Sequence, residues 1–63
     1  MNLWVQLTSR LDRTKVWVNL GAAIIIAPDS GGSRITMQGR EKDIFVAEAP
    51  DQVMARKAAE QDK

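Results

Sequence analysis

The residues that most often carry out enzyme chemistry are missing from this chain. Among its 63 residues there is no histidine, cysteine or tyrosine. General acid–base and nucleophilic mechanisms usually recruit His, Cys, or a Ser or Thr beside a base, so most catalytic constellations are excluded. Without His or Cys the usual zinc sites cannot be built either. We therefore expect a protein that is not an enzyme and that uses no metal or cofactor.

Carboxylates and a glycine pair are the remaining candidates for chemistry. Most carboxylates fall in expected turns or near the expected helix start; they are Asp12, Asp29, Glu41, Asp43, Glu48 and Asp51. Asp and Glu are mostly exposed in folded proteins, so we interpret these as solvated loop residues. Gly31-Gly32 does not form a P-loop, because no Gly-Lys-Ser/Thr ending follows and the next element is a strand.

Two tryptophans are the side chains best suited to binding. Trp4 and Trp17 occupy positions of the same parity in two expected strands, opposite the aliphatic positions. If these strands pair, both indoles lie on one face, with Gln6 and Lys15 at its edges. Such a face could anchor an interface or stack on single-stranded bases, or it could be covered by the terminal helix. We expect it to mediate self-association.

The shortness of the chain supports that expectation. A domain of about 60 residues buries only about 60% of the surface that its unfolded chain exposes, so its stability is marginal. Disulfides and zinc, which usually reinforce small domains, are not available to a chain without cysteine or histidine. Oligomerisation is the remaining device, and we expect a homo-oligomer or a docked accessory subunit.

The N-terminal part has the period-two pattern of strands with one buried face. Residues 3–8 alternate apolar and outward positions, and residues 15–18 do so again. The polar stretch 9–13 between them is typical of a hairpin connection. At Asn19-Leu20-Gly21 we expect a bend, because Asn and Gly tolerate positive φ.

A continuous apolar run follows at residues 22–27. Its isoleucines, Ile24, Ile25 and Ile26, favour β structure because branching at Cβ restricts χ1 in a helix. The run predicts a central strand that is buried on both faces. Residues 28–32, Pro-Asp-Ser-Gly-Gly, predict a tight turn in which the two glycines can supply positive φ, so a hairpin should close there.

The C-terminal part predicts two more strands and a helix. Residues 34–38 and 44–46 flank a polar turn at 39–42, and a helix should begin at Pro50 because proline suits the first helical position. The expected fold is mainly β: five short antiparallel strands in a bent sheet or small barrel, with a C-terminal helix from about residue 50, in one domain spanning 1–63. The predicted core consists of Val5, Leu7, Val16, Val18, Ile24, Ile26, Ile35, Ile44 and Val46.

Charge and hydropathy carry less information. The longest apolar run is far shorter than the roughly 20 residues that cross a bilayer, and no secretory signal is evident, so we expect a cytoplasmic location without a membrane span. The net charge is +1, divided into +3 over residues 1–40 and −2 over residues 41–63. Such a division can mark a face for an anionic partner, but in a domain of this size we interpret it first as solvation of the outer face.

Five segments follow, in order, the pattern of a known family. They are Val5-Gln6-Leu7-Thr8, Lys15-Val16-Trp17-Val18-Asn19, Pro28-Asp29, Arg34-Ile35-Thr36-Met37 with Gly39, and residues 46–53. In these segments the chain resembles the small flagellar FlbD-like family over nearly its full length. It departs from that family at residues 11–13, where a glycine turn is usual, at Leu20-Gly21, which replaces Pro-Asp, and at Ala49, which replaces a capping serine. The resemblance implies a non-catalytic accessory protein connected with flagellar assembly or motor function, without active-site residues.

The alternative is a small RNA-binding regulator. The carbon storage regulator family is similar in size, with five short strands and a C-terminal helix. It follows its opening Leu-Thr with arginine, where this chain has Ser9, and places arginine before its helix, where this chain has Glu48. A negative side chain there would repel phosphate, whose neutralisation provides much of the affinity for nucleic acid. We therefore rank an adaptor or structural protein first, an RNA-binding regulator second and an enzyme third, and expect protein rather than nucleic acid partners.

Overall fold

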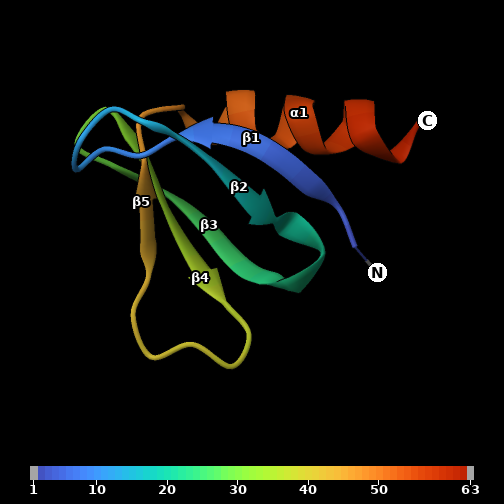
Figure 1. Ribbon diagram of the computed structural model, residues 1–63, viewed down its shortest axis with the longest axis horizontal. Coiled ribbons are helices and arrows are strands. Elements are labelled where there is room, and N and C mark those ends of the chain that lie inside the picture. Colours follow the sequence, from blue (N-terminus) through green and yellow to red (C-terminus); the bar gives the residue numbers. More distant parts are fainter. Residues whose placement is uncertain (1, 63) are drawn as a thin grey trace.

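Five strands and one helix make up the fold in the computed structural model, which describes residues 2–62. The elements are β1 (Trp4–Thr8), β2 (Lys15–Asn19), the 3₁₀ helix η1 (Leu20–Ala22), β3 (Ala23–Asp29), β4 (Gly32–Met37), β5 (Ile44–Val46) and α1 (Pro50–Gln61). Strands β1 and β2 form one antiparallel sheet, and β3, β4 and β5 form a second, with α1 running along β1 (Figure 1). The predicted mainly β fold with a C-terminal helix is confirmed. Residues 1 and 63 of the expected domain lie outside the described part.

The two sheets meet at one corner and are not closed into a barrel. Ser9 forms an isolated antiparallel bridge with Val46, and the backbone N–H of Ala47 donates a hydrogen bond of 2.8 Å to the carbonyl oxygen of Thr8. The strands therefore follow one another in a bent arrangement that runs from β2 through β1, β5 and β4 to β3. Within residues 2–62, β2 and β3 each pair with a single strand, so both are edge strands.

Side chains from both sheets and from α1 form one hydrophobic cluster. Its buried members are Leu3, Val5, Leu7, Val18, Leu20, Ile35, Met37, Val46 and Val53, and Val16, Ile26 and Ile44 are partly buried against them. Eight of the nine predicted core residues thus lie in or against the core; Ile24 does not. The buried residues that the predicted core did not include are Leu3, Leu20, Met37 and Val53. Leu20 became part of the core because η1 turns it inward, although its neighbours suggested an exposed bend.

Strand β3 departs from the prediction of a central strand buried on both faces, which is wrong. It pairs with β4 alone, and the side chains of Ile24 and Ile25 are 63% and 52% exposed. A register shift between Ala23 and Ile25 interrupts the ladder, and only Ile26 of the three isoleucines packs against the core. Pro28 fits an edge strand, because it has no N–H to offer a further neighbour. An apolar run does not reveal how many strands flank it.

The bend after β2 also forms differently from the expectation. Asn19 has a φ of −85°, and its side-chain oxygen accepts a hydrogen bond of 3.1 Å from the backbone N–H of Gly21. A capped 3₁₀ turn thus replaces the expected positive φ.

The hairpin between β3 and β4 closes within the predicted turn, with Ser30-Gly31 as a two-residue loop. Both loop residues have positive φ, 49° and 84°, which is the type I′ geometry that suits a hairpin. Gly32 is required for another reason, since a Cβ there would collide with the carbonyl oxygen of Val46. The two glycines therefore serve different needs, positive φ at Gly31 and close approach at Gly32.

Helix α1 begins at Pro50, as predicted. Ala49 offers no side-chain cap. Its backbone N–H donates a hydrogen bond of 3.0 Å to Oε1 of Gln52, so a side chain of the first helical turn caps the helix start. Val53 is the buried residue of the helix, and the inward positions that follow, Lys57 and Glu60, are only partly buried. The helix is therefore docked mainly by its first turns. Among residues 2–62, no helix is long and apolar enough to cross a membrane.

Candidate contact surface

The outer face of the β1–β2 sheet brings the four predicted interface residues together. Gln6 lies directly opposite Trp17, and Trp4 lies opposite Asn19, which makes the two indoles diagonal neighbours across the strand pair. Diagonal positions are within reach of aromatic side chains. Lys15 begins β2 on the same face. We call Trp4, Gln6, Lys15 and Trp17 the tryptophan face.

Both indoles of the tryptophan face are open to solvent. Trp4 is 52% exposed and Trp17 is 64% exposed, and Gln6 and Lys15 are exposed as well. The alternation that buries Leu7 and its neighbours fixes this direction, because successive side chains of a strand point to opposite faces. Large exposed apolar side chains that gather on one face of a small protein usually mark a contact site.

Polar contacts hold both ends of the tryptophan face. At one end the Lys15 ammonium donates a hydrogen bond of 2.9 Å to the hydroxyl of Thr8. At the other end the side-chain oxygen of Asn19 accepts a bond of 2.9 Å from the backbone N–H of Leu3. The two strands that carry the indoles are thus tied together beyond their own ladder.

Helix α1 flanks the tryptophan face without covering it. The guanidinium of Arg56 donates a hydrogen bond of 2.7 Å to the carbonyl oxygen of Gln6, on the side of β1 that faces away from β2. A groove of about 210 Å³ lies between the helix and the sheet; its lining comprises Val5, Gln6, Trp17, Arg56, Ala59 and Glu60. The indole of Trp17 therefore forms one wall of an open groove.

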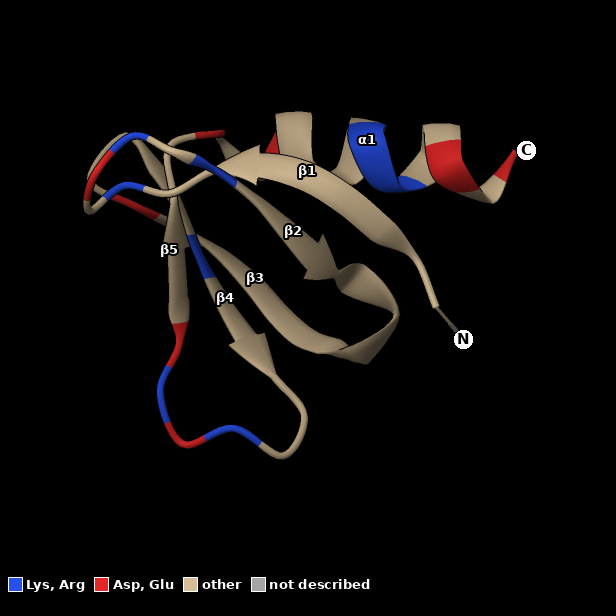
Figure 2. Cartoon of the chain, in the orientation of Figure 1, with Lys and Arg blue, Asp and Glu red and all other residues tan. Residues whose placement is uncertain are grey.

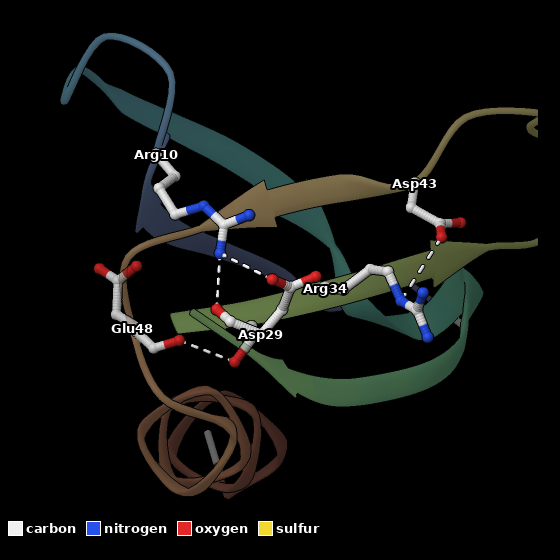
Figure 3. Close-up of polar contacts among 6 residues, drawn as sticks. Arg10, Asp29, Arg34, Asp43 and Glu48 are labelled. Atoms are coloured by element: carbon white, nitrogen blue, oxygen red, sulfur yellow. Dashed lines mark hydrogen bonds and ion pairs between the residues drawn. The ribbon is translucent and has the colours of Figure 1, made fainter. Parts of the chain in front are cut away.

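A second group of contacts joins the two sheets near the start of α1. Glu48 is only 8% exposed, and its two carboxylate oxygens accept bonds of 2.9 and 3.0 Å from the backbone N–H of Thr8. The Thr8 hydroxyl donates to the same carboxylate at 3.0 Å. The Ser33 hydroxyl donates to the Glu48 carbonyl oxygen at 2.7 Å, the dashed bond at Glu48 in Figure 3. We call Thr8, Ser33 and Glu48 the sheet junction.

The position of Glu48 corrects two sequence-based interpretations. It is not a solvated loop residue, because its carboxylate completes the hydrogen bonding of β1. Its carboxylate is also directed into the sheet junction and is mostly buried, so the argument that it would repel RNA phosphate is weaker than the sequence suggested. Burial is the largest influence on the pKa of Glu48 and raises it, but the bonds from Thr8 and from its own backbone N–H, with the positive charge of Arg56, outweigh burial and leave the pKa below its ordinary value.

Arg10 makes a third set of contacts, on the outer side of the second sheet. Its Nη1 lies 2.6 Å from the carbonyl oxygen of Asp29 and 3.5 Å from the carboxylate of the same residue (Figure 3). Its guanidinium carbon lies 4.9 Å from the centre of the Phe45 ring. The loop after β1 is thereby attached to the end of β3.

Within residues 2–62, no group of three or more His, Cys, Asp or Glu side chains could hold a metal ion. The charged residues are spread over the loops, the helix and single strand positions, whereas β1 carries none (Figure 2). Comparisons with protein-family models, with curated proteins and with solved structures give no match. The assignment of the tryptophan face as a contact surface therefore rests on its geometry alone.

Proposed function

We propose that the protein is a non-catalytic accessory or adaptor protein that acts through protein–protein contacts, and that the tryptophan face is its contact surface. The observation that carries this proposal is that two indoles, each more than half exposed, lie as diagonal neighbours on one face of the hydrogen-bonded strand pair β1–β2. Tryptophan is enriched among the residues that dominate binding energy.

The exposed indoles provide part of the free energy that association requires. A buried indole removes about 150 to 250 Å² from water. At about 25 cal/mol per Å², covering the exposed half of both indoles contributes about 4 to 6 kcal/mol before the entropy of association is subtracted. Contacts around the indoles must supply the rest, and the groove beside Trp17 offers room for them.

A second copy of the chain is the first partner that we propose. The face is apolar apart from Gln6, which can both donate and accept, and from Lys15 at one end. In a two-fold dimer the tryptophan face of one copy would contact the same face of the other copy. Lys15 lies at one end of the face, so the two Lys15 side chains would lie at opposite ends of the interface. A short chain without disulfides also gains stability from such an association.

The connection with flagellar assembly or motor function is part of this proposal and is supported by the resemblance alone. Its cheapest test is the position of the gene. Flagellar genes on either side would favour a role in that machinery, whereas an unrelated neighbourhood would leave the contact module without that assignment.

Sedimentation of the purified chain tests the contact surface. We expect a sedimentation coefficient that rises with concentration in the micromolar range, and a monomer after Trp17→Ala. Leu11→Ala is the matched control, because Leu11 is 91% exposed but lies in the β1–β2 loop, outside the tryptophan face. Equal effects of the two substitutions would show that general hydrophobicity, and not this face, drives association.

RNA binding is the alternative, and the exposed indoles give it some support because bases stack on aromatic side chains. Among the described residues, the basic positions are scattered along the chain and do not form the stripe that tracks a phosphate backbone (Figure 2). Salt-sensitive binding of single-stranded RNA that is lost in Trp17→Ala would place the RNA-binding function first.

A further inference from the structure

A second hollow lies where the β1–β2 loop meets the β3–β4 turn. Its volume is about 90 Å³, and its lining comprises Arg10, Arg13, Ser30, Gly31, Gly32 and Ala47. None of these residues belongs to the tryptophan face. Two arginines and a glycine-containing turn therefore line one small concavity that the proposed contact function does not use.

Backbone conformation singles out the same place. Among residues 2–62, two residues other than glycine have positive φ, Arg13 at 62° and Ser30 at 49°, and both line this hollow. Positive φ is unfavourable for residues with a Cβ, and glycine would meet the same backbone requirement without strain. Such outliers concentrate at functional sites. At both positions the chain carries a residue with a polar side chain, an arginine and a serine, although glycine would adopt the same backbone conformation without strain.

Arg10 is oriented in advance of binding. Its Nη1 is held by Asp29, and its guanidinium carbon lies over the Phe45 ring, 4.9 Å from the ring centre. No described residue accepts a hydrogen bond from its Nε or Nη2, so these donors remain available. A side chain that is already fixed loses less conformational freedom when a ligand arrives.

The two nearby carboxylates, Asp12 and Asp29, do not pair with the Arg13 guanidinium. Asp29 partly neutralises Arg10. Asp12, next to Arg13 in the chain, directs its carboxylate to Thr14, at 2.7 Å from the hydroxyl and 3.2 Å from the backbone N–H. Neither carboxylate is among the residues that line the hollow, and no described residue accepts a bond from the Arg13 guanidinium. A positive charge thus remains at the hollow.

We propose that this hollow binds a single phosphate group, either as free phosphate or at the end of a small monoester. Guanidinium groups match the oxygens of phosphate with paired hydrogen bonds, and turns with positive φ can direct backbone N–H groups towards an anion. Arg10 and Arg13 supply the charge, and Ser30 adds a hydroxyl donor. The volume admits a tetrahedral anion but no sugar or base, so the rest of a monoester would extend into solvent.

The first test is a titration of the full chain with sodium phosphate, followed through backbone amide resonances. We expect saturable shifts at Ser30, Gly31 and Gly32, with a dissociation constant on the order of 1 mM. A parallel titration with sodium chloride at equal ionic strength must leave these resonances unchanged. Glycerol phosphate distinguishes the source: tighter binding of this ester assigns a monoester, and tighter binding of inorganic phosphate assigns the free anion. Equal shifts with chloride would overturn the proposal.

The sharpest variant is Arg13→Gly, which removes a guanidinium and relieves strain at once. We expect its melting temperature to rise by about 4 to 8 °C, the shift that relief of this strain gives in a domain of this size. Its affinity for phosphate should fall at least fivefold. Loss of binding in a more stable protein cannot be attributed to unfolding.

Arg40→Gln is the matched control, because it removes the same charge from the exposed β4–β5 loop. It should bind phosphate as the unsubstituted chain does, and so should Trp17→Ala, which tests the tryptophan face separately. If Arg13→Gly binds normally, or if Arg40→Gln weakens binding as much, phosphate is an adventitious ion only and the proposal is wrong.

Discussion

The sheet junction and the tryptophan face place their side chains in opposite ways. At the junction a carboxylate lies buried, satisfied by the backbone and hydroxyl of Thr8. On the face two indoles lie exposed, although tryptophan usually contributes to cores. The two regions share strand β1, so one strand carries both arrangements.

This difference separates what holds the fold from what remains for a partner. A buried charge is retained only where hydrogen bonds compensate its desolvation, so the junction serves the fold itself. Exposed indoles contribute little to the isolated chain and gain energy only when covered. Substitutions at the junction should therefore change the stability of the monomer, and substitutions on the face should change association.

Gly32→Ala should have the largest effect on the junction side. A Cβ at Gly32 would meet the carbonyl oxygen of Val46, which is backbone and cannot move aside cheaply. We expect a loss of folding, visible as the disappearance of dispersed amide resonances. Gly31→Asn is the control, because nothing lies within 4 Å of a Cβ there and Asn tolerates the positive φ of 84°. A similar loss of folding in both variants would show that the turn conformation is critical, and not the close approach of Gly32 to the Val46 carbonyl oxygen.

The isoleucines distinguish buried from exposed apolar positions. Ile35 is fully buried, and Ile35→Ala should cost about 2 to 5 kcal/mol of unfolding free energy in urea titrations. Ile24→Ala should cost less than about 0.5 kcal/mol, because this side chain is exposed on β3. A large cost at Ile24 at low protein concentration would mean that β3 is covered even in the monomer.

Glu48→Gln should cost about 1 to 3 kcal/mol near pH 7, because one of the two acceptors for Thr8 becomes a donor. Folding lowers the pKa of Glu48, so the unfolded chain takes up the proton more readily. The stabilisation is therefore complete above the ordinary glutamate pKa and is lost as pH falls through the lower pKa of the folded state. Urea titrations from pH 7 to pH 3 should show the difference between the two proteins narrowing.

Glu41→Gln is the control for that titration, since Glu41 is an exposed carboxylate in the β4–β5 loop. Its effect should stay within about 0.5 kcal/mol at every pH. A difference between wild type and Glu48→Gln that stays constant down to pH 3 would show that the charge of Glu48 does not stabilise the fold.

Much of the fold could be predicted because its strands alternate cleanly. Val5 and Leu7 in β1 and Ile35 in β4 lie inside as the period of two requires. Pro50 marked the helix start for a physical reason that applies in any context. The shared side of Trp4 and Trp17 followed from the same parity.

The features that sequence reasoning missed depend on neighbours distant in the chain. The exposure of Ile24 fits the position of β3 at the edge of its sheet, where it pairs with β4 alone. Pro28 was the local sign of an edge strand, but it was assigned to the turn instead. The role of Glu48 requires Thr8, 40 residues away. Arg13 adopts a positive φ of 62°, and the residue type gave no sign of it.

The measurement that tests the central claim most directly is the melting temperature as a function of protein concentration, for the unsubstituted chain and for Trp17→Ala. If the tryptophan face binds a second copy only in the folded state, mass action requires the melting temperature to rise with concentration. We predict that rise for the unsubstituted chain and a constant melting temperature for Trp17→Ala. An unsubstituted chain whose melting temperature stays constant up to high micromolar concentration would contradict self-association through this face.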